Sequence, residues 1–274
     1  MDELHIKKRK LEQHLAELGS VAVAFSAGVD STFLLKTAHE VLKDDAVAVT
    51  VTSAVFPERE QRAAEAFCAA EGIRLIETPL DIFAVDGFCA NPENRCYLCK
   101  KEICGKLRKI AAQLGKEHII EGSNLDDTGD YRPGMRALRE CGVRSPMIEA
   151  GLTKNDVRAL SAEYGLQTWE KPSLACLATR IPYGEEITPE KLGRIDKAEQ
   201  KLGELGFRQF RVRCHGDTAR IELPPEEIGR CTEKTVRDAV TAYFHQIGFR
   251  YVSLDLDGYR TGSMNAGKRG GEKL

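Results

Sequence analysis

The chain has 274 residues, 42% of them hydrophobic and 30% charged, which is enough to bury a core in one large domain or in two unequal ones. Its 40 basic residues nearly balance its 42 acidic ones, so no overall field favours nucleic acid or an acidic membrane surface. No apolar run long enough for a signal peptide or a membrane span follows the charged start, so we expect a cytoplasmic protein.

The first part of the chain alternates strand-like and helix-like patterns. Apolar and β-branched runs predict strands at 20–26, 46–52, 73–77 and 118–121. Between them, helical spacing of apolar residues predicts helices at 31–41, 58–72 and 99–114. This alternation is typical of an α/β fold with a doubly wound parallel sheet, which we assign to residues 1–170. Ligands in such sheets bind beyond the carboxyl ends of the strands.

The pattern changes in the second part, residues 171–274, which we assign to a smaller α+β domain. Predicted helices lie at 189–205 and 233–245, and predicted strands at 207–213, 218–223 and 249–254. His215, Gly216 and Asp217 form the expected hairpin turn. The stretch from Tyr259 to Leu274 is rich in Gly and Lys, and we expect a flexible tail there.

A short loop with phosphate-binding character lies between the first predicted strand and the first predicted helix. Its residues are Ser26, Ala27, Gly28, Val29, Asp30 and Ser31. The glycine lets backbone N–H groups crowd around an anion, and the positive end of the following helix points at the same spot. No lysine follows the glycine, which argues against a γ-phosphoryl-transfer loop. The alternative is an ordinary turn in which Asp30 or Ser31 caps the helix.

Asp30 carries a negative charge and cannot attract phosphate itself. Two tasks fit it: accepting backbone N–H bonds that fix the loop, and holding Mg²⁺ beside the phosphates. We therefore expect a phosphate-bearing ligand and Mg²⁺ to bind here.

The sequence has nine cysteines, an odd number, and no secretion signal. We therefore expect them to be free thiols, metal ligands or catalytic groups rather than a disulfide framework. Most stand alone in apolar surroundings, where a buried thiol is a small hydrophobe. Cys96 and Cys99 form a C-x-x-C pair, which fits a metal site, a redox pair or chance. Cys176 lies near Lys171 and Arg180, whose charges could ionise its thiol if the fold brings them close.

The hexapeptide from Ser26 resembles the S-G-G-x-D-S loop of the ATP pyrophosphatase (PP-loop) superfamily, whose members cleave ATP to AMP and pyrophosphate. Ala27 departs from the second position; its methyl group is harmless only if the residue has a negative φ. Most of the chain further resembles the LarE sulfur transferases of nickel pincer nucleotide synthesis. The resembling blocks are N-P-E-N-R-C-Y-L-C-K (91–100), E-G-S-N-L-D-D-T-G-D-Y-R-P-G (121–134), E-A-G-L-T-K (149–154), K-P-S-L-A-C-L-A-T-R-I-P-Y-G (171–184) and R-V-R-C-H-G-D-T-A-R-I-E (211–222).

The resemblance implies that ATP activates the carboxylates of pyridinium-3,5-biscarboxylic acid mononucleotide, which become thiocarboxylates, and that the protein is a hexamer. Two sulfur sources fit it. Cys176 could give up its own sulfur and become dehydroalanine, so that each chain works once. Alternatively Cys96, Cys99 and Cys176 could hold a [4Fe-4S] cluster whose fourth iron carries a sulfide. Because both C-x-x-C thiols accompany Cys176 in the family blocks, we favour the cluster.

Further polar residues complete the predicted site. Asp126, Asp127 and Asp130 follow a strand end, where carboxylates can position a nucleotide or Mg²⁺; the alternative is a solvated turn. Candidates for gripping phosphate or carboxylate are Arg132, Arg136, Arg180, Arg211 and Arg213.

In R-V-R, strand alternation puts Arg211 and Arg213 on one face, where they could form a two-pronged anion site. The alternative is that they are simply the polar face of a half-buried strand. Glu199 and Glu222 match acidic positions of the family's site and are expected metal ligands. The rival functions are an amide-forming or tRNA-thiolating enzyme of the superfamily, and a nucleotide-binding regulator without catalysis. The balanced charge weighs against RNA.

Overall fold

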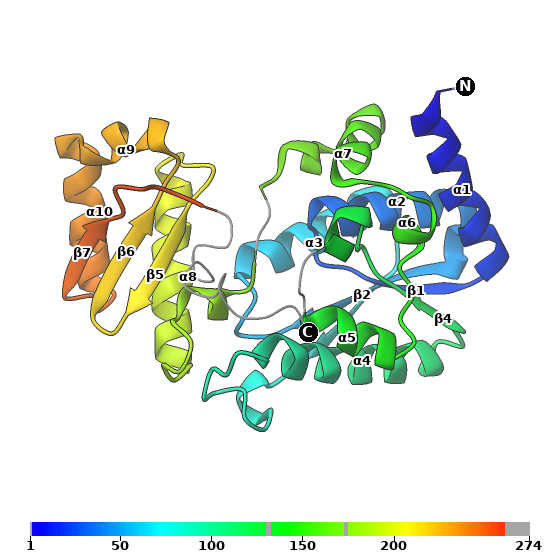
Figure 1. Ribbon diagram of the computed structural model, residues 1–274, viewed down its shortest axis with the longest axis horizontal. Helices are drawn as coiled ribbons and strands as arrows, with labels where there is room; N and C mark the ends of the chain where they lie inside the picture. Colours follow the sequence, from blue (N-terminus) through cyan, green and yellow to red (C-terminus); the bar gives the residue numbers. More distant parts are fainter. Residues whose placement is uncertain (1, 130–132, 173–174, 261–274) are drawn as a thin grey trace. The chain divides into compact units, whose positions relative to one another are not determined.

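The computed structural model describes residues 2–129, 133–172 and 175–260 (Figure 1). Two compact units form: one of Met1–Phe88 with Glu93–Leu174, the other of Cys89–Pro92 with Ala175–Leu274. The short piece of the second unit that interrupts the first is held by the Asn91 amide, which donates to the carbonyls of Ile181 and Pro182.

The first unit is built on four parallel strands in the order β3-β2-β1-β4. Their bounds are β1 Val21–Ala24, β2 Ala46–Thr52, β3 Leu75–Pro79 and β4 His118–Ile120. The chain adds β2 and β3 on one side of β1 and then crosses over to add β4 on the other side, with Val21 paired to both Ala46 and His118. The predicted parallel sheet is confirmed, and its strand order reverses between β1 and β4.

Helices cover both faces of this sheet, as a doubly wound fold requires (Figure 1). One face packs against α1 Glu3–Leu18, α2 Val29–Leu42, α3 Glu58–Glu71, α6 Pro146–Glu149 and α7 Lys154–Glu163. The other face packs against α4 Arg95–Gln113 and α5 Pro133–Glu140. Short 3-10 turns lie at Lys43–Asp45, Ile82–Ala84, Leu125–Gly129 and Gln167–Glu170.

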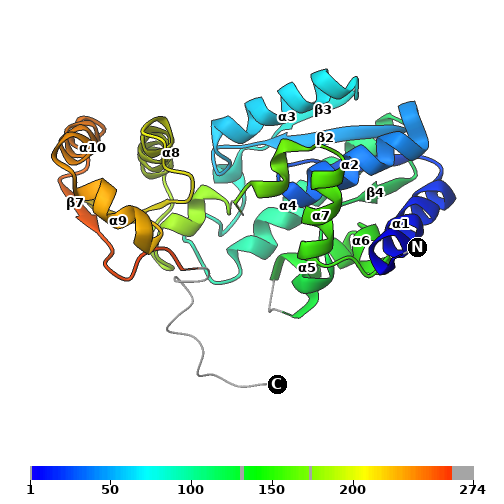
Figure 2. The same ribbon diagram turned by 90° about the horizontal axis from the view of Figure 1, so that it is seen from above.

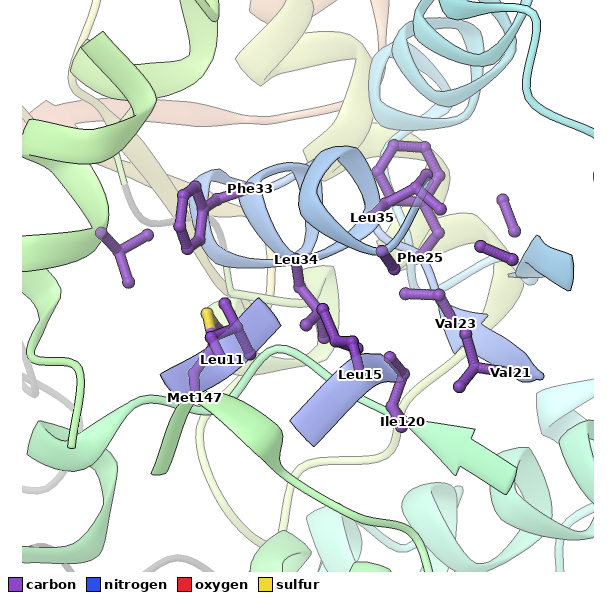
Figure 3. Close-up of a cluster of buried hydrophobic side chains, with 14 of the residues drawn as sticks. Leu11, Leu15, Val21, Val23, Phe25, Phe33, Leu34, Leu35, Ile120 and Met147 are labelled. Atoms are coloured by element: carbon purple, nitrogen blue, oxygen red, sulfur yellow. The ribbon is translucent and has the colours of Figure 1, made fainter. Parts of the chain in front are cut away.

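The main core forms because side chains alternate between the two faces of each strand and recur on one face of each helix. Val21 and Val23 of β1 point to the side of α1 and α2, whereas Ala22 between them belongs to the cluster under α4. Figure 3 shows side chains from α1, α2, β1, β4 and α6 converging in the larger cluster. Complete burial of a side chain such as Phe33 stabilises the fold by about 1.5–3 kcal/mol.

The second unit holds a three-stranded sheet in the order β5-β6-β7. Its strands are β5 Arg211–His215, β6 Thr218–Glu222 and β7 Tyr251–Leu254, and its helices are α8 Pro189–Glu204, α9 Pro225–Thr232 and α10 Lys234–Gln246. β5 and β6 form a hairpin in which His215 pairs with Thr218, while β7 joins β6 in parallel. The α8 and α10 helices lie side by side (Figure 2).

The structure differs from the sequence prediction at several elements. α1, α5, α6, α7 and α9 were not predicted; α1 is rich in charge, and its buried stripe is only Leu11, Leu15 and Leu18. β5 begins at Arg211 rather than at 207, because a turn ending at Gly206, whose φ is 84°, is followed by a bend at 208–209 before the strand starts. Most of the predicted flexible tail, 261–274, lies outside the described residues. No helix in the described ranges is both long and apolar enough to cross a membrane.

Candidate active site

The predicted phosphate loop lies at the carboxyl end of β1, next to the point where the strand order reverses. Gly28 is the N-cap of α2 and makes no side-chain cap bond, so the first N–H groups of the helix face a site suited to an anion. Neither Asp30 nor Ser31 is the cap. Instead the Ser31 hydroxyl accepts the Ser26 amide at 3.3 Å, lies 3.0 Å from the Ser26 hydroxyl and donates to the Gly28 carbonyl at 3.3 Å. These bonds close the loop into a compact ring.

Ala27 has a left-handed backbone with φ 53°. The negative φ that would make its methyl group harmless is therefore not adopted, and the residue costs about 1–2 kcal/mol more here than glycine would. Such strain persists only where surrounding contacts hold the backbone in place. Two contacts do so: Thr50 of β2 donates to the Phe25 carbonyl at 3.0 Å, and Lys171 donates to the Ala27 carbonyl at 2.9 Å.

Gly122, just beyond β4, closes the loop from the other side. A Cβ at this glycine would stand 2.8 Å from the Ser31 amide nitrogen and 3.0 Å from the Ser31 Cα. Only a residue without a side chain lets the two segments after β1 and β4 approach this closely.

We expect Gly122→Ala to push the start of α2 away, lowering the free energy of unfolding by about 1–3 kcal/mol and weakening ATP binding. Gly105→Ala on α4 is the matched control, since nothing lies within 4 Å of its added methyl group. There the better helix propensity of alanine should stabilise by up to about 1 kcal/mol. Thermal melting and ATP titration of both variants check this; equal behaviour of the two would contradict it.

Asp30 is held by side chains from two later segments. Its Oδ1 accepts the Asn124 amide at 3.1 Å, and its Oδ2 forms an ion pair with the Lys154 ammonium at the start of α7. The predicted backbone N–H partners are replaced by these two side chains. Mg²⁺ at this carboxylate would compete with Lys154 for Oδ2, and a nearby phosphate oxygen would offer that ammonium a new partner.

Two carboxylates of the acidic turn after β4 accept backbone N–H groups. Asp127 accepts the Asn124 amide at 3.0 Å, and Asp126 accepts the Lys154 amide at 2.8 Å. The two residues whose amides are held, Asn124 and Lys154, are the same two whose side chains contact Asp30, so the turn supports the site; its contact with a nucleotide or Mg²⁺ stays a prediction. Asp130 and Arg132 lie outside the described residues, and Arg136 pairs with Glu140 on α5.

The second unit contains two buried ion pairs at the predicted arginines. Arg180 and Glu199 are both 0% exposed and share two bonds, Nε to Oε1 at 2.8 Å and Nη2 to Oε2 at 3.1 Å. Arg213 makes the same two-pronged contact with Glu222, at 2.9 and 2.8 Å. A metal ion at Glu199 or Glu222 would compete with a buried guanidinium, and the expected metal ligation stays a prediction.

Arg211 is a third buried arginine of the same unit. It is buried beside Arg180 and Tyr259, and burial followed by the charge of Arg180 lowers the pKa of Arg211 to about 10. Among the described residues of this unit, the buried charged side chains are Arg180, Arg211, Arg213, Glu199 and Glu222.

Cys176 is half-buried and precedes the 3-10 turn Leu177–Arg180. Its carbonyl accepts the Thr179 hydroxyl at 2.7 Å and the Arg180 Nη1 at 3.0 Å. Arg180 therefore holds the backbone of Cys176, while Arg213 donates to the Thr179 carbonyl at 2.8 Å. Lys171, the other predicted neighbour, contacts the phosphate loop.

Cys96 and Cys99 lie in the first two turns of α4, both half-buried, within the first unit. Cys176 belongs to the second unit. Across the described ranges, no group of three or more His, Cys, Asp or Glu side chains could hold a metal ion. The predicted [4Fe-4S] cluster receives no support from these residues and stays a prediction.

Comparison with known proteins identifies the family of the chain. No protein-family model matches it. An uncharacterized protein of Synechocystis sp. is 44% identical over 96% of this chain and 98% of that protein. The pyridinium-3,5-bisthiocarboxylic acid mononucleotide synthase of Lactiplantibacillus plantarum is 40% identical over 97% of this chain and 96% of the synthase. The chain belongs to this synthase family.

A more distant similarity agrees with the synthase assignment. One subunit of the glutamine-hydrolyzing GMP synthase of Thermoplasma volcanium is 25% identical over 68% of this chain and 65% of that protein. This agrees with the PP-loop superfamily that the sequence of the loop predicted, and the parallel sheet agrees with it as well.

Several residues of the site were not predicted from the sequence. Asn124, Lys154 and Gly122 all lie inside blocks that resemble the synthase family, but no local pattern assigns them to Asp30 or Ser31. One hint was present in the sequence, which is that the loop contains no lysine of its own. In the structure a lysine comes from elsewhere: Lys154, 124 residues after Asp30, contacts the Asp30 carboxylate.

Proposed function

We propose that this synthase-family member uses ATP to adenylate the carboxylates of pyridinium-3,5-biscarboxylic acid mononucleotide and replaces carboxylate oxygen with sulfur. The single observation that carries the proposal is the loop from Ser26 to Ser31 in a chain that matches the synthase along nearly its whole length. Uncapped N–H groups and the start of α2 supply anion binding at the strand-order reversal, where nucleotides bind in such folds.

The chemistry requires activation first. A carboxylate is a poor electrophile, and hydroxide leaves it badly, whereas AMP leaves readily from an acyl adenylate. In the first step a carboxylate oxygen attacks the α-phosphorus, and pyrophosphate departs. Lys154 would steady that pyrophosphate after leaving Asp30. Mg²⁺, once bound near Asp30, would neutralise phosphate charge.

Of the two sulfur sources expected from the sequence, we propose the sacrificial one in place of the favoured cluster, which gains no support from the described residues: Cys176 is the sulfur nucleophile. Its thiolate attacks the acyl carbon and releases AMP, which leaves a thioester. Loss of the Cys176 α-proton then breaks the Cβ–Sγ bond, and the electron pair goes to sulfur. The products are a thiocarboxylate and dehydroalanine at position 176. The protein thus gives up one sulfur, and each chain serves one carboxylate.

The charged cluster of the second unit suits the substrate's phosphate. Arg211 and Arg213 lie on the same face of β5, and burial followed by the charge of nearby Arg180 lowers the pKa of Arg211. A phosphate monoester carries the negative charge and the oxygens that paired guanidinium groups bind best. Assembly into a homo-oligomer stays a prediction.

The test uses oxygen-free protein, Mg-ATP and the pyridinium dicarboxylate. We expect AMP and pyrophosphate in equal amounts, and an intact mass that falls by the elements of H₂S. AMP formed without any thiocarboxylate, and only on addition of ammonia, would instead indicate an amide-forming enzyme, which the GMP synthase similarity keeps as the second candidate. Binding of ATP with no pyrophosphate released would indicate a regulator.

A further inference from the structure

Lys171 is the residue that links the phosphate loop to the segment leading towards Cys176. Its ammonium donates to the Ala27 carbonyl at 2.9 Å and to Glu60 Oε2 at 2.7 Å. The ion pair with Glu60 is largely sheltered, with the two side chains 20% and 14% exposed. Glu60 lies in the first turn of α3, so one ammonium joins the loop, a helix and the chain before position 172.

The backbone of Lys171 is fixed as well. Arg158 of α7 donates to the Lys171 carbonyl at 3.0 Å and also to the Trp169 carbonyl. Lys171 therefore reaches the loop from a backbone that is itself held in place. Because the backbone of Lys171 is already ordered, less conformational entropy is lost when its ammonium binds. Its hydrogen bonds therefore stabilise the structure more than those of a mobile surface lysine.

The strained backbone of Ala27 needs a contact that holds it in place, and Lys171 provides one. The Ala27 backbone is left-handed, and the carbonyl that Lys171 holds belongs to the same residue. If that carbonyl were released, the peptide unit between Ala27 and Gly28 could rotate towards a more relaxed conformation. The amides after it would then turn away from the anion that they are proposed to bind.

We propose that Lys171 is a positioning residue that keeps the loop in its ATP-binding conformation by holding the Ala27 carbonyl, with Glu60 keeping the ammonium there. This inference rests on the proposed ATP site. It assigns Lys171 to the loop rather than to ionisation of the Cys176 thiol.

Isothermal titration with Mg-ATP tests the proposal on the full chain. Lys171→Gln loses the charged bond to Ala27, and ATP should bind about tenfold more weakly or worse. Lys171→Arg can still donate to both Ala27 and Glu60, so its affinity should recover most of the loss. Lys36→Gln is the matched control, because Lys36 also pairs with a carboxylate of α3, Glu71 at 2.8 Å, yet contacts no loop residue in the described structure.

Glu60→Gln separates positioning from direct phosphate contact. Removing a carboxylate near the loop would strengthen the binding of a polyanion if Lys171 simply reached out to phosphate. If Glu60 instead holds the ammonium on Ala27, the same change should weaken ATP binding several-fold.

Unchanged or tighter binding by Glu60→Gln, or wild-type affinity in Lys171→Gln, would overturn the positioning role while leaving the proposed function intact. Failure of the wild-type protein to bind Mg-ATP would overturn the proposed function itself. Melting temperatures of all four variants identify any loss of binding that comes from unfolding.

Discussion

Cys176→Ala is expected to bind Mg-ATP and to release pyrophosphate with the pyridinium substrate, but to produce no thiocarboxylate. The change removes the only atom assigned to attack the acyl carbon, while the phosphate loop lies in the other unit and keeps its bonds. Loss of sulfur transfer should therefore exceed about a thousandfold, up to the detection limit. Anaerobic single-turnover reactions, with AMP and thiocarboxylate quantified separately, measure the two steps.

A control for that experiment is Cys141→Ala, because the Cys141 thiol is also half-buried but lies after α5, away from the described loop contacts. It should retain both steps. Cys96→Ala addresses the sulfur source: full activity is expected if Cys176 donates its own sulfur, whereas inactivity together with bound iron and sulfide would favour the cluster. Thiocarboxylate formed by Cys176→Ala would contradict the assigned role under either mechanism.

Glu199→Gln should cause the largest loss of stability among the site residues. Glu199 is completely buried, accepts two bonds from Arg180 and also accepts the Val212 amide at 3.2 Å. Neutralising it leaves the Arg180 charge buried without its counter-ion, which costs about 3–5 kcal/mol. Amide hydrogen exchange at Val212 reports opening of this unit itself, and it should accelerate strongly.

The matched control is Asp238→Asn on α10, which removes an ion pair with Arg237 whose side chains are 54% and 56% exposed. An exposed pair of this kind contributes about 0–1 kcal/mol, so exchange at Val212 should stay near the wild-type rate. Equal protection in both variants would show that the buried pair does not stabilise the unit. Because Arg180 also holds the Cys176 carbonyl, Glu199→Gln should in addition slow sulfur transfer in the fraction that remains folded.

Local patterns in the sequence determined the scaffold of this protein. β2 spans 46–52 as predicted, and α3, α4 and α8 match within a few residues, because apolar periodicity over one element reports which side is buried. The phosphate-binding character of the loop from Ser26 to Ser31 was also predictable, because the strand, the glycine and the helix that create it follow one another directly in the chain. The blocks that resemble the LarE family then limited the expected reaction to ATP-dependent sulfur transfer.

Only the tertiary structure decided how the charged residues are paired and how the loop is held. Asp30 meets Lys154, Ala27 meets Lys171 and Arg180 meets Glu199, and no local periodicity encodes which of 40 basic residues joins which acidic partner. The sign of φ at Ala27 likewise depends on contacts made from distant segments rather than on the alanine itself. The physical reason is range: hydrophobic spacing reports burial within one element, whereas a specific ion pair exists only once folding has brought two separate elements together.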